Sequence, residues 1–252
     1  MLNYVKAHRM ALLSMDSYLP VTEFAERYGD QFEFFSEGTT QCYLLHASKR
    51  SIAQSHIIAE DELIIVFRGT EPNQIEDIKT DLEFLKSYES GWGDVHHGFQ
   101  EALDLVYPAL LDKVASIRNY QRLVFCGHSL GAALATLCMA RMGDVDSELY
   151  TFGSPRVGDR DFACAFNCQR PKVYAFRNNN DIVTRMPKIG YRHVGTMYYF
   201  DSFGHLKIDP AWWYRFKEFC SGMIDGFISY EIDSFKDHSI SNYVRCLSNY
   251  AR

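Results

Sequence analysis

Residues 127–131 have the sequence GHSLG, in which a serine stands between two glycines in a G-x-S-x-G pattern. The pattern lies between an apolar, strand-like run, 122–126, and a helical run of small residues, 130–142. A sharp turn from a buried strand into a helix holds a serine hydroxyl above the sheet edge, and the two glycines avoid collisions there. The helix N-terminus beneath the serine also favours developing negative charge. The pattern therefore predicts that Ser129 is a nucleophile.

A serine hydroxyl needs a base that takes its proton and a third group that orients the base. Asp181 follows a predicted strand, 172–176, and a polar stretch, 178–180, so we expect it on a loop at a strand end. Four other acids lie close behind the 130–142 helix or before that strand: Asp144, Asp146, Asp159 and Asp161. If the order is nucleophile, acid, base, three histidines remain as candidate bases: His193, His205 and His238.

The rest of the chain alternates between strand and helix patterns. Residues 62–67 are apolar except at the first position, which is typical of a strand covered on both faces. Further strands are predicted at 40–47, 51–59, 122–126, 148–152 and 172–176, and further helices at 2–18 and 98–118. This alternation predicts parallel βαβ units. No repeat, low-complexity stretch or linker divides the chain, so we expect a single domain, 1–252.

Several segments resemble the class 3 (fungal-type) triacylglycerol lipases. In order they are FRGTE, VHHGF, GHSLGAALATL, YTFGSPRVGD and NNNDIVTRMP, and the resemblance covers residues 40–247. It implies an α/β-hydrolase fold, with a mostly parallel central sheet flanked by helices and a nucleophile elbow at Gly127–Gly131. It also implies hydrolysis of lipid or other apolar carboxylic esters through an acyl-enzyme, without a cofactor or a metal.

The resemblance selects the acid and the base. Asp181 matches the aspartate of the family's N-x-D-x-V pattern, and the segment 237–243 resembles its D-H-x-x-Y close. His238 also precedes a predicted short helix, 239–247, whose N-terminus disfavours an imidazolium and helps to keep the ring a neutral base. The expected catalytic residues are Ser129, Asp181 and His238.

The other histidines are interpreted as structural. His193 matches a family position that opens a strand and is not catalytic, and His205 lies in a loop without an assigned place. His96 and His97 are adjacent, but the H-E-x-x-H spacing of a zinc site is absent and VHHGF matches a family motif that leads into a helix. We therefore expect no metal.

An ester hydrolase also needs preformed N–H donors for the oxyanion of the tetrahedral intermediate. One expected donor is the backbone N–H of Leu130, which follows the nucleophile. By resemblance the second is Thr70, directly after the buried strand 62–67, and its hydroxyl adds a further donor.

Two apolar segments flank the expected site. Residues 71–86 follow Thr70 and have four apolar residues at helical spacing, which indicates a mobile lid or a helix packed on the core. This stretch departs from the family by lacking a tryptophan, which argues against strong interfacial activation. Residues 211–228 are rich in aromatic side chains and form either core or a wall of an acyl pocket. The apolar residues of these two segments are compatible with transient contact between the protein and a lipid interface.

Composition limits the partners and the compartment. A net charge of −6 argues against nucleic acid as a partner, and no apolar run is long enough to span a membrane. Seven cysteines without a CxxC pair suggest mostly reduced thiols. Because the first twenty residues lack a convincing signal peptide, we expect a cytoplasmic protein, although a mature secreted chain would look the same.

Two other functions remain open. The same three residues can transfer an acyl group to an alcohol or cut a thioester. A non-catalytic binding protein that kept the hydrolase fold is the other alternative, but such a protein has no need of all three residues. The sequence does not indicate the acyl chain length or the head group of the substrate.

Overall fold

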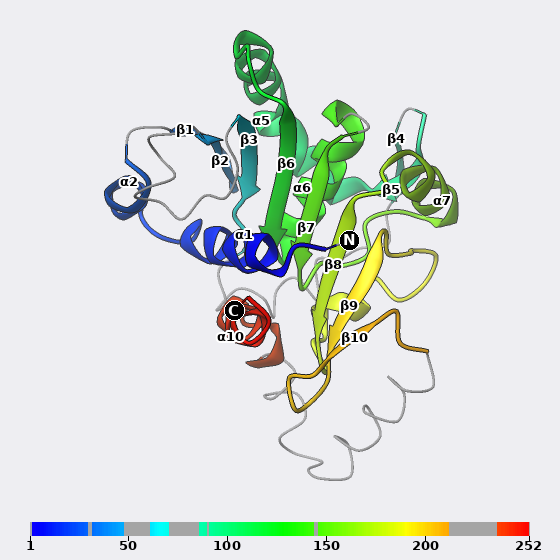
Figure 1. The fold of residues 1–252 in the computed structure, drawn as a ribbon. Coiled ribbons are helices and arrows are strands. Elements are labelled where there is room, and N and C mark those ends of the chain that lie inside the picture. The colour runs from blue at the N-terminus through cyan, green and yellow to red at the C-terminus, as the bar shows by residue number, and fades with distance from the viewer. Residues whose placement is uncertain are drawn as a thin grey trace.

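A computed structural model describes residues 2–29, 32–47, 61–70, 86–89, 91–143, 146–211 and 236–251. Its centre is an eight-stranded sheet with the order β1-β2-β3-β6-β7-β8-β9-β10 (Figure 1). These strands are β1 (Phe32–Glu37), β2 (Thr40–Ala47), β3 (Glu62–Phe67), β6 (Arg122–His128), β7 (Glu148–Phe152), β8 (Val173–Asn178), β9 (Thr196–Phe200) and β10 (Leu206–Ile208). The pairings from β3 through β9 are parallel, and the edges are antiparallel. The predicted mostly parallel sheet is confirmed.

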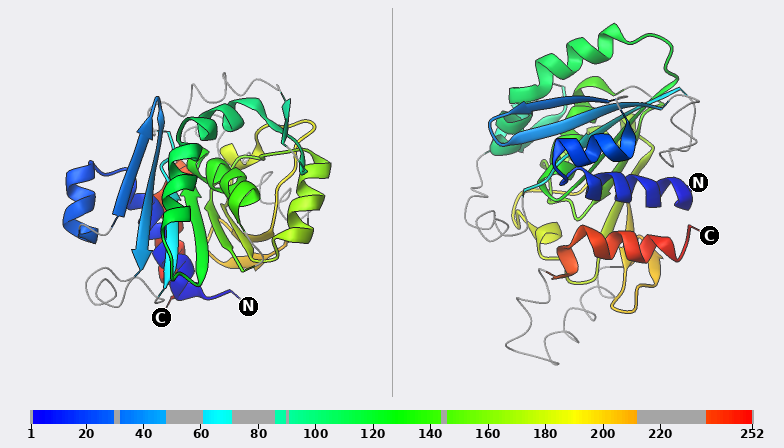
Figure 2. Two further views of the ribbon diagram at one scale, coloured as in Figure 1. Left: turned by 90° about the horizontal axis from the view of Figure 1, so that it is seen from above. Right: turned by 90° about the vertical axis from the view of Figure 1, so that its left-hand side faces the viewer.

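Helices cover both faces of this sheet (Figure 2). On one face lie α5 (His97–Ser116), α6 (Leu130–Met142) and α7 (Arg160–Gln169), and on the other lie α1 (Tyr4–Asp16), α2 (Val21–Tyr28) and α10 (Ile240–Ser248). A short 3₁₀ helix, η2 (Val183–Arg185), follows β8, and β4 (Lys86–Glu89) pairs with β5 (Gly93–His96) in a separate small sheet. No helix in the described parts of the chain is long and apolar enough to span a membrane.

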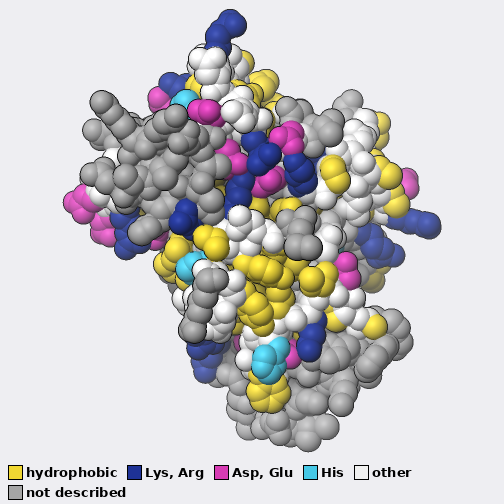
Figure 3. Space-filling model, in the orientation of Figure 1, with side chains coloured by type: hydrophobic (Ala, Val, Ile, Leu, Met, Phe, Trp, Pro, Cys, Tyr) yellow, Lys and Arg dark blue, Asp and Glu magenta, His cyan; other side chains and the backbone are white. Residues whose placement is uncertain are grey.

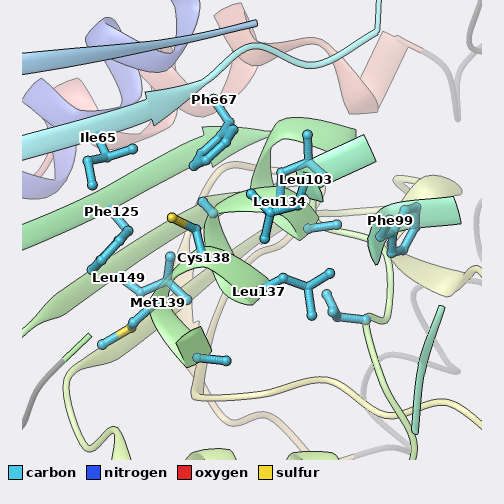
Figure 4. Packing of buried hydrophobic residues seen from close by; sticks show 14 of the residues in the cluster. Ile65, Phe67, Phe99, Leu103, Phe125, Leu134, Leu137, Cys138, Met139 and Leu149 are labelled. Atoms are coloured by element: carbon cyan, nitrogen blue, oxygen red, sulfur yellow. The ribbon is translucent and has the colours of Figure 1, made fainter. Parts of the chain in front are cut away.

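The apolar run of β3 is explained by burial on both faces. All six of its residues are buried, and successive side chains alternate between two hydrophobic clusters. Ile65 and Phe67 belong to the cluster under α5 and α6 (Figure 4), whereas Ile64 and Val66 belong to the cluster under α1 and α10. A strand covered on one face only would alternate apolar with polar residues, so this sequence requires the two helical layers that the structure has.

The predicted elements that fall within the described residues are present, some of them with shifted ends. Strand β6 extends two residues beyond 122–126 and β8 two beyond 172–176, while α5 stops at Ser116 because Ile117 is extended. Eight elements were not predicted: β1, β4, β5, β9, β10, α2, α7 and η2. The predicted strand 51–59 lies outside the described residues. So do the candidate lid 71–86, apart from Lys86 in β4, and the segment 211–228, apart from Ala211.

Candidate active site

The elbow between β6 and α6 holds Ser129 in a backbone conformation that serine rarely adopts, with φ 57° and ψ −129°. Its flanking glycines have no room for a side chain. A Cβ on Gly127 would lie 2.4 Å from the Gly131 carbonyl oxygen, and a Cβ on Gly131 would lie 2.2 Å from the Phe67 carbonyl oxygen. The two glycines of the pattern are therefore required by contacts within the turn and against the end of β3.

The parallel strands bring the predicted residues to one edge of the sheet. Thr70 follows β3, Ser129 follows β6 and Asp181 follows β8, each just beyond the carboxyl end of its strand. Ligand sites of open α/β sheets lie outside these ends. His238 comes from far along the chain, immediately before α10, and packs against the same edge.

His238 and Asp181 form a fully buried pair. The His238 Nδ1 lies 2.9 Å from both carboxylate oxygens of Asp181, and the two side chains have no exposed surface. Asp181 also accepts from the Val183 backbone N–H at 3.0 Å. Because an ionised carboxylate only accepts, the ring proton lies on Nδ1 and the lone pair of a neutral ring lies on Nε2.

Asp181 is held as a carboxylate by its neighbours. Burial alone would raise its pKa, but the charge and the hydrogen bond of His238, together with the Tyr243 hydroxyl, hold the pKa below its ordinary value. A carboxylate beside Nδ1 fixes the ring orientation and stabilises the imidazolium that forms when Nε2 takes a proton.

Two polar atoms remain without partners at this edge. Within the described residues, neither Ser129 Oγ nor His238 Nε2 has a hydrogen-bond partner, although both atoms are buried. The Ser129 backbone N–H donates to the Phe152 carbonyl at 3.0 Å, and a Cβ on the next residue, Gly153, would lie 3.0 Å from His238 Nδ1. The serine and the histidine therefore adjoin the same end of β7. The structure contains no hydrogen bond between them, and such bonds are often loose without substrate.

The two expected oxyanion donors flank Ser129. Leu130 is the first residue of α6, where backbone N–H groups have no acceptor within the helix. Thr70 follows Gly69, and a Cβ on Gly69 would lie 3.2 Å from Ser129 Cβ. The end of β3 thus packs beside the elbow. The donor role of Thr70 and Leu130 stays a prediction.

The loops that carry the acid and the base are tied together by Asp237. Its Oδ2 accepts from Asn179 Nδ2 at 3.0 Å and from the Asn180 backbone N–H at 3.2 Å, and its carbonyl accepts from Asn178 Nδ2 at 2.9 Å. Sequence reasoning assigned no role to the three asparagines. Their position directly before Asp181 was the available signal.

The four histidines that the sequence analysis interpreted as structural make other contacts. His193 precedes β9, and its Nε2 lies 2.7 Å from the Thr184 carbonyl oxygen, which requires the ring proton on that nitrogen. His205 is exposed beside Asp201, His96 packs on Phe99, and His97 pairs with Glu101 on the surface. The described residues contain no group of three or more His, Cys, Asp or Glu side chains that could hold a metal ion.

Comparison with known sequences identifies the family. The sequence model of the family described as "Lipase (class 3)" matches residues 64–191, which is more than half of the chain. The chain belongs to the class 3 lipase family. The matched segment contains the elbow and Asp181 but ends before His238, so the base is the residue that the family match does not cover.

Individual class 3 lipases are similar over part of this chain. A secreted mono- and diacylglycerol lipase 1 of Fusarium solani is 38% identical over 114 residues, covering 42% of this chain and 34% of that protein. The triacylglycerol lipase OBL1 of Arabidopsis thaliana is 30% identical over 195 residues, covering 56% of this chain and 38% of that protein. The chain therefore spans little more than a third of the length of these relatives.

A solved structure of a class 3 lipase is similar over most of this chain. The Rhizomucor miehei lipase in its native propeptide complex superposes with a TM-score of 0.66 and 25% identity, over 80% of this chain and 70% of that one. The α/β-hydrolase fold predicted from the sequence is thus shown both by this likeness and by the sheet topology.

Proposed function

We propose that the chain is a serine hydrolase that cuts carboxylic esters of lipids or other apolar acids. Ser129 is the nucleophile, His238 the general base and acid, and Asp181 the group that orients it. The observation that carries the proposal is the buried Asp181–His238 pair. Within the described residues, neither the Nε2 of His238 nor the Oγ of Ser129 has a hydrogen-bond partner, and both residues adjoin the same end of β7. Leaving a buried donor and acceptor unsatisfied lowers stability. Such a loss is not expected in a turn with a purely structural role, so it indicates a function.

In acylation, Ser129 Oγ attacks the ester carbonyl carbon while His238 Nε2 takes the hydroxyl proton. The carbonyl oxygen becomes an oxyanion, which accepts from the backbone N–H groups of Thr70 and Leu130. The C–O bond to the alcohol then breaks, and the alcohol leaves with the proton from Nε2. The products are the free alcohol and an acyl ester on Ser129.

In deacylation, a water molecule attacks the acyl-enzyme and gives a proton to the same His238 Nε2. A second oxyanion forms at the same donors and collapses to the free carboxylic acid. The proton on Nε2 returns to Ser129 Oγ, which restores the resting site. Throughout both steps Asp181 stays ionised and holds the ring proton at Nδ1.

The test combines covalent labelling with turnover of p-nitrophenyl esters. A fluorophosphonate probe should label the wild-type chain but not Ser129→Ala, and the substitution should lower kcat by a factor on the order of 10⁶. Asp181→Asn and His238→Ala should each lower kcat by on the order of 10⁴. Wild-type turnover by Ser129→Ala, with its fold intact by circular dichroism, would overturn the proposal.

Lipid esters are the proposed substrates because the two relatives described above are named for acylglycerols. The proposed partners are small-molecule esters or lipids, with transient contact at a lipid interface, and not nucleic acid. On the face that carries α1, acidic and basic side chains are interspersed and do not form one basic patch (Figure 3). Initial rates on dispersed mono-, di- and triacylglycerols, measured side by side, test the substrate class.

Acyl transfer and thioester cleavage use the same three residues and are separated by product analysis. A p-nitrophenyl ester supplied with a long-chain alcohol gives only free acid if water is the acceptor, and a new ester if the alcohol is. Thioester cleavage is tested with an acyl thioester substrate and a reagent that detects the released thiol. We favour hydrolysis, because the two relatives described above are named as lipases.

The cytoplasm stays our proposed compartment, although the Fusarium relative is named as secreted. Six cysteines in the described residues are free: Cys42, Cys126, Cys138, Cys164, Cys168 and Cys246. Four of them are buried, as expected for small apolar core residues. Fractionation of the producing cells followed by fluorophosphonate labelling of each fraction tests the compartment.

A further inference from the structure

One tyrosine just after the N-terminal helix lies at the edge of the site. Helix α1 ends at Asp16, and the next residues close it with backbone bonds from Ser17 to the Leu13 carbonyl and from Tyr18 to the Met15 carbonyl. This turn places the Tyr18 hydroxyl 2.9 Å from His128 Nδ1. The same phenol oxygen lies against Gly69, where an added Cβ would be 2.2 Å from it.

His128, directly before the nucleophile, has its other ring nitrogen engaged as well. Its Nε2 lies 2.7 Å from the carbonyl oxygen of His238, and the two rings have centroids 4.5 Å apart. A carbonyl oxygen only accepts, so the His128 proton lies on Nε2. Burial, with the nearby His238, lowers the pKa of His128 to about 3, so the ring is neutral and Nδ1 is an acceptor.

These facts give the hydrogen bonds a single direction. The Tyr18 O–H donates to His128 Nδ1. His128 Nε2–H then donates to the His238 carbonyl. The chain of bonds begins at Tyr18, which lies against Gly69, passes through the residue before Ser129 and ends on the main chain of the base.

Gly69 is closely packed against both Tyr18 and the elbow. A Cβ on Gly69 would lie 2.2 Å from the Tyr18 oxygen and 2.5 Å from the His128 carbonyl oxygen. The Arg68 guanidinium carbon lies 5.7 Å from the centre of the Tyr18 ring, within the range of a cation–π contact. The end of β3 is therefore held between the phenol and the elbow, and the orientation of the following Thr70 depends on both.

We propose that Tyr18 and His128 are positioning residues that hold the oxyanion donor at Thr70 and the base His238 in register with Ser129. The proposal rests on the proposed ester hydrolysis and adds to it two residues that never touch the reacting atoms. Oxyanion donors work because they are fixed before charge develops, and small displacements of reacting groups reduce rates sharply. Loss of the Tyr18 hydroxyl should thus weaken binding of the tetrahedral transition state and leave ground-state substrate binding unchanged.

The test is Tyr18→Phe, which removes the hydroxyl and keeps the ring on Arg68. We expect kcat to fall about tenfold to a hundredfold with KM nearly unchanged. This decrease in kcat is smaller than the one expected when an oxyanion donor itself is removed. The affinity of an alkyl boronic acid, which forms a tetrahedral adduct with the serine, should fall by the same factor. A merely structural role would not move the boronic acid affinity and kcat together.

Two further variants keep the result interpretable. Tyr28→Phe removes a partly buried hydroxyl that lies away from the site and donates to Asp16 at 2.8 Å. This variant should keep wild-type kcat. His128→Gln keeps an N–H donor for the His238 carbonyl and should retain more activity than His128→Leu, which keeps none. Thermal unfolding of each variant shows whether a loss of rate is a loss of fold.

Nitrogen-15 spectra of the histidine rings test the hydrogen bonds without turnover. We expect His128 to carry its proton on Nε2, and Tyr18→Phe to shift the Nδ1 resonance and leave Nε2 nearly unmoved. The inference is overturned if the proton lies on Nδ1. It is also overturned if Tyr18→Phe keeps wild-type kcat and boronic acid affinity while Ser129→Ala is inactive. Failure of the proposed function itself would differ, because the wild-type chain would then not react with fluorophosphonate.

Discussion

The Tyr243 hydroxyl lies 2.5 Å from Asp181 Oδ2, so the buried carboxylate accepts from a phenol as well as from His238. The same hydroxyl oxygen accepts from the Asn178 backbone N–H at 3.1 Å. Burial first, and then the adjacent carboxylate, raises the pKa of Tyr243 well above its ordinary value, so the phenol remains a donor at neutral pH. Helix α10 thus supplies a further fixed donor to the acid of the site.

Tyr243→Phe should lower kcat about tenfold with little change in KM, because the carboxylate keeps His238 but loses a donor worth roughly 1–3 kcal/mol. The pKa of Asp181 should rise. Tyr150→Phe is the matched control, since its buried hydroxyl donates to Glu148 at 3.0 Å in another part of the core. Equal kcat values for the two variants, at equal thermal stability, would contradict a role of Tyr243 in the site.

Gly153→Ala should disrupt the acid–base pair. Gly153 has φ +62°, and a Cβ there would lie 2.8 Å from Asp181 Oδ2 and 3.0 Å from His238 Nδ1. We expect kcat to fall by about 10²-fold or more, as for reacting groups displaced by an ångström. Gly91→Ala is the control, because it has a similar φ of +79° but no atom within 4 Å. Both variants bear the strain of alanine at positive φ, and only Gly153→Ala should lose esterase activity.

His193→Ala tests the choice of base. His193 donates to the Thr184 carbonyl in the turn after Asp181, so its loss should lower the free energy of unfolding by about 1 kcal/mol. Its kcat should stay within a factor of about ten of wild type, against on the order of 10⁴ for His238→Ala. Steady-state kinetics and urea unfolding of both variants measure the two effects. An inactive His193→Ala beside an active His238→Ala would mean that the base is assigned wrongly.

The local pattern of the sequence was sufficient for the elbow. The glycines at 127 and 131 and the buried strand before them constrain the backbone within a few residues, so the turn was predictable without tertiary information. Strand β3 was predictable for a related reason, since a continuous apolar run indicates burial on both faces. Strand β1 was not, because its residues are only partly buried and give no clear alternation.

Contacts between distant segments were beyond the reach of the sequence. Tyr18 follows a helix that looks like any amphipathic N-terminal segment, and only the packing of α1 on the sheet brings it to His128. The His128 side chain was likewise read only as the variable position of the elbow pattern. Gly153 stood in a recognised segment, directly after β7, but its contact with the His238 ring depends on a residue much later in the chain.

The buried neutral state of His128 has a consequence for stability against acid. Its pKa is lowered to about 3 in the folded chain, chiefly by burial, from an ordinary value of 6.5. Between these values the unfolded chain binds a proton that the folded chain does not, so stability falls as the pH decreases from 6.5 toward 3. The groups facing the ring are Tyr18, His238, Asp181 and Tyr243.

His128→Gln should therefore reduce the acid sensitivity of folding. In wild type this one group contributes a slope of up to about 1.4 kcal/mol per pH unit below pH 6.5, and glutamine contributes none. Asp181 affects stability at lower pH. Because its pKa is lowered in the folded chain, the stabilisation that the ionised carboxylate provides is lost only as the pH falls below the ordinary value of 3.8. Urea unfolding from pH 7.5 to 4.5 separates the two groups. As the pH decreases, the free energy of unfolding should decline less steeply in His128→Gln than in wild type, whatever the difference between the two at pH 7.5. Parallel plots of the free energy of unfolding against pH would contradict this and show that His128 is protonated in the folded chain.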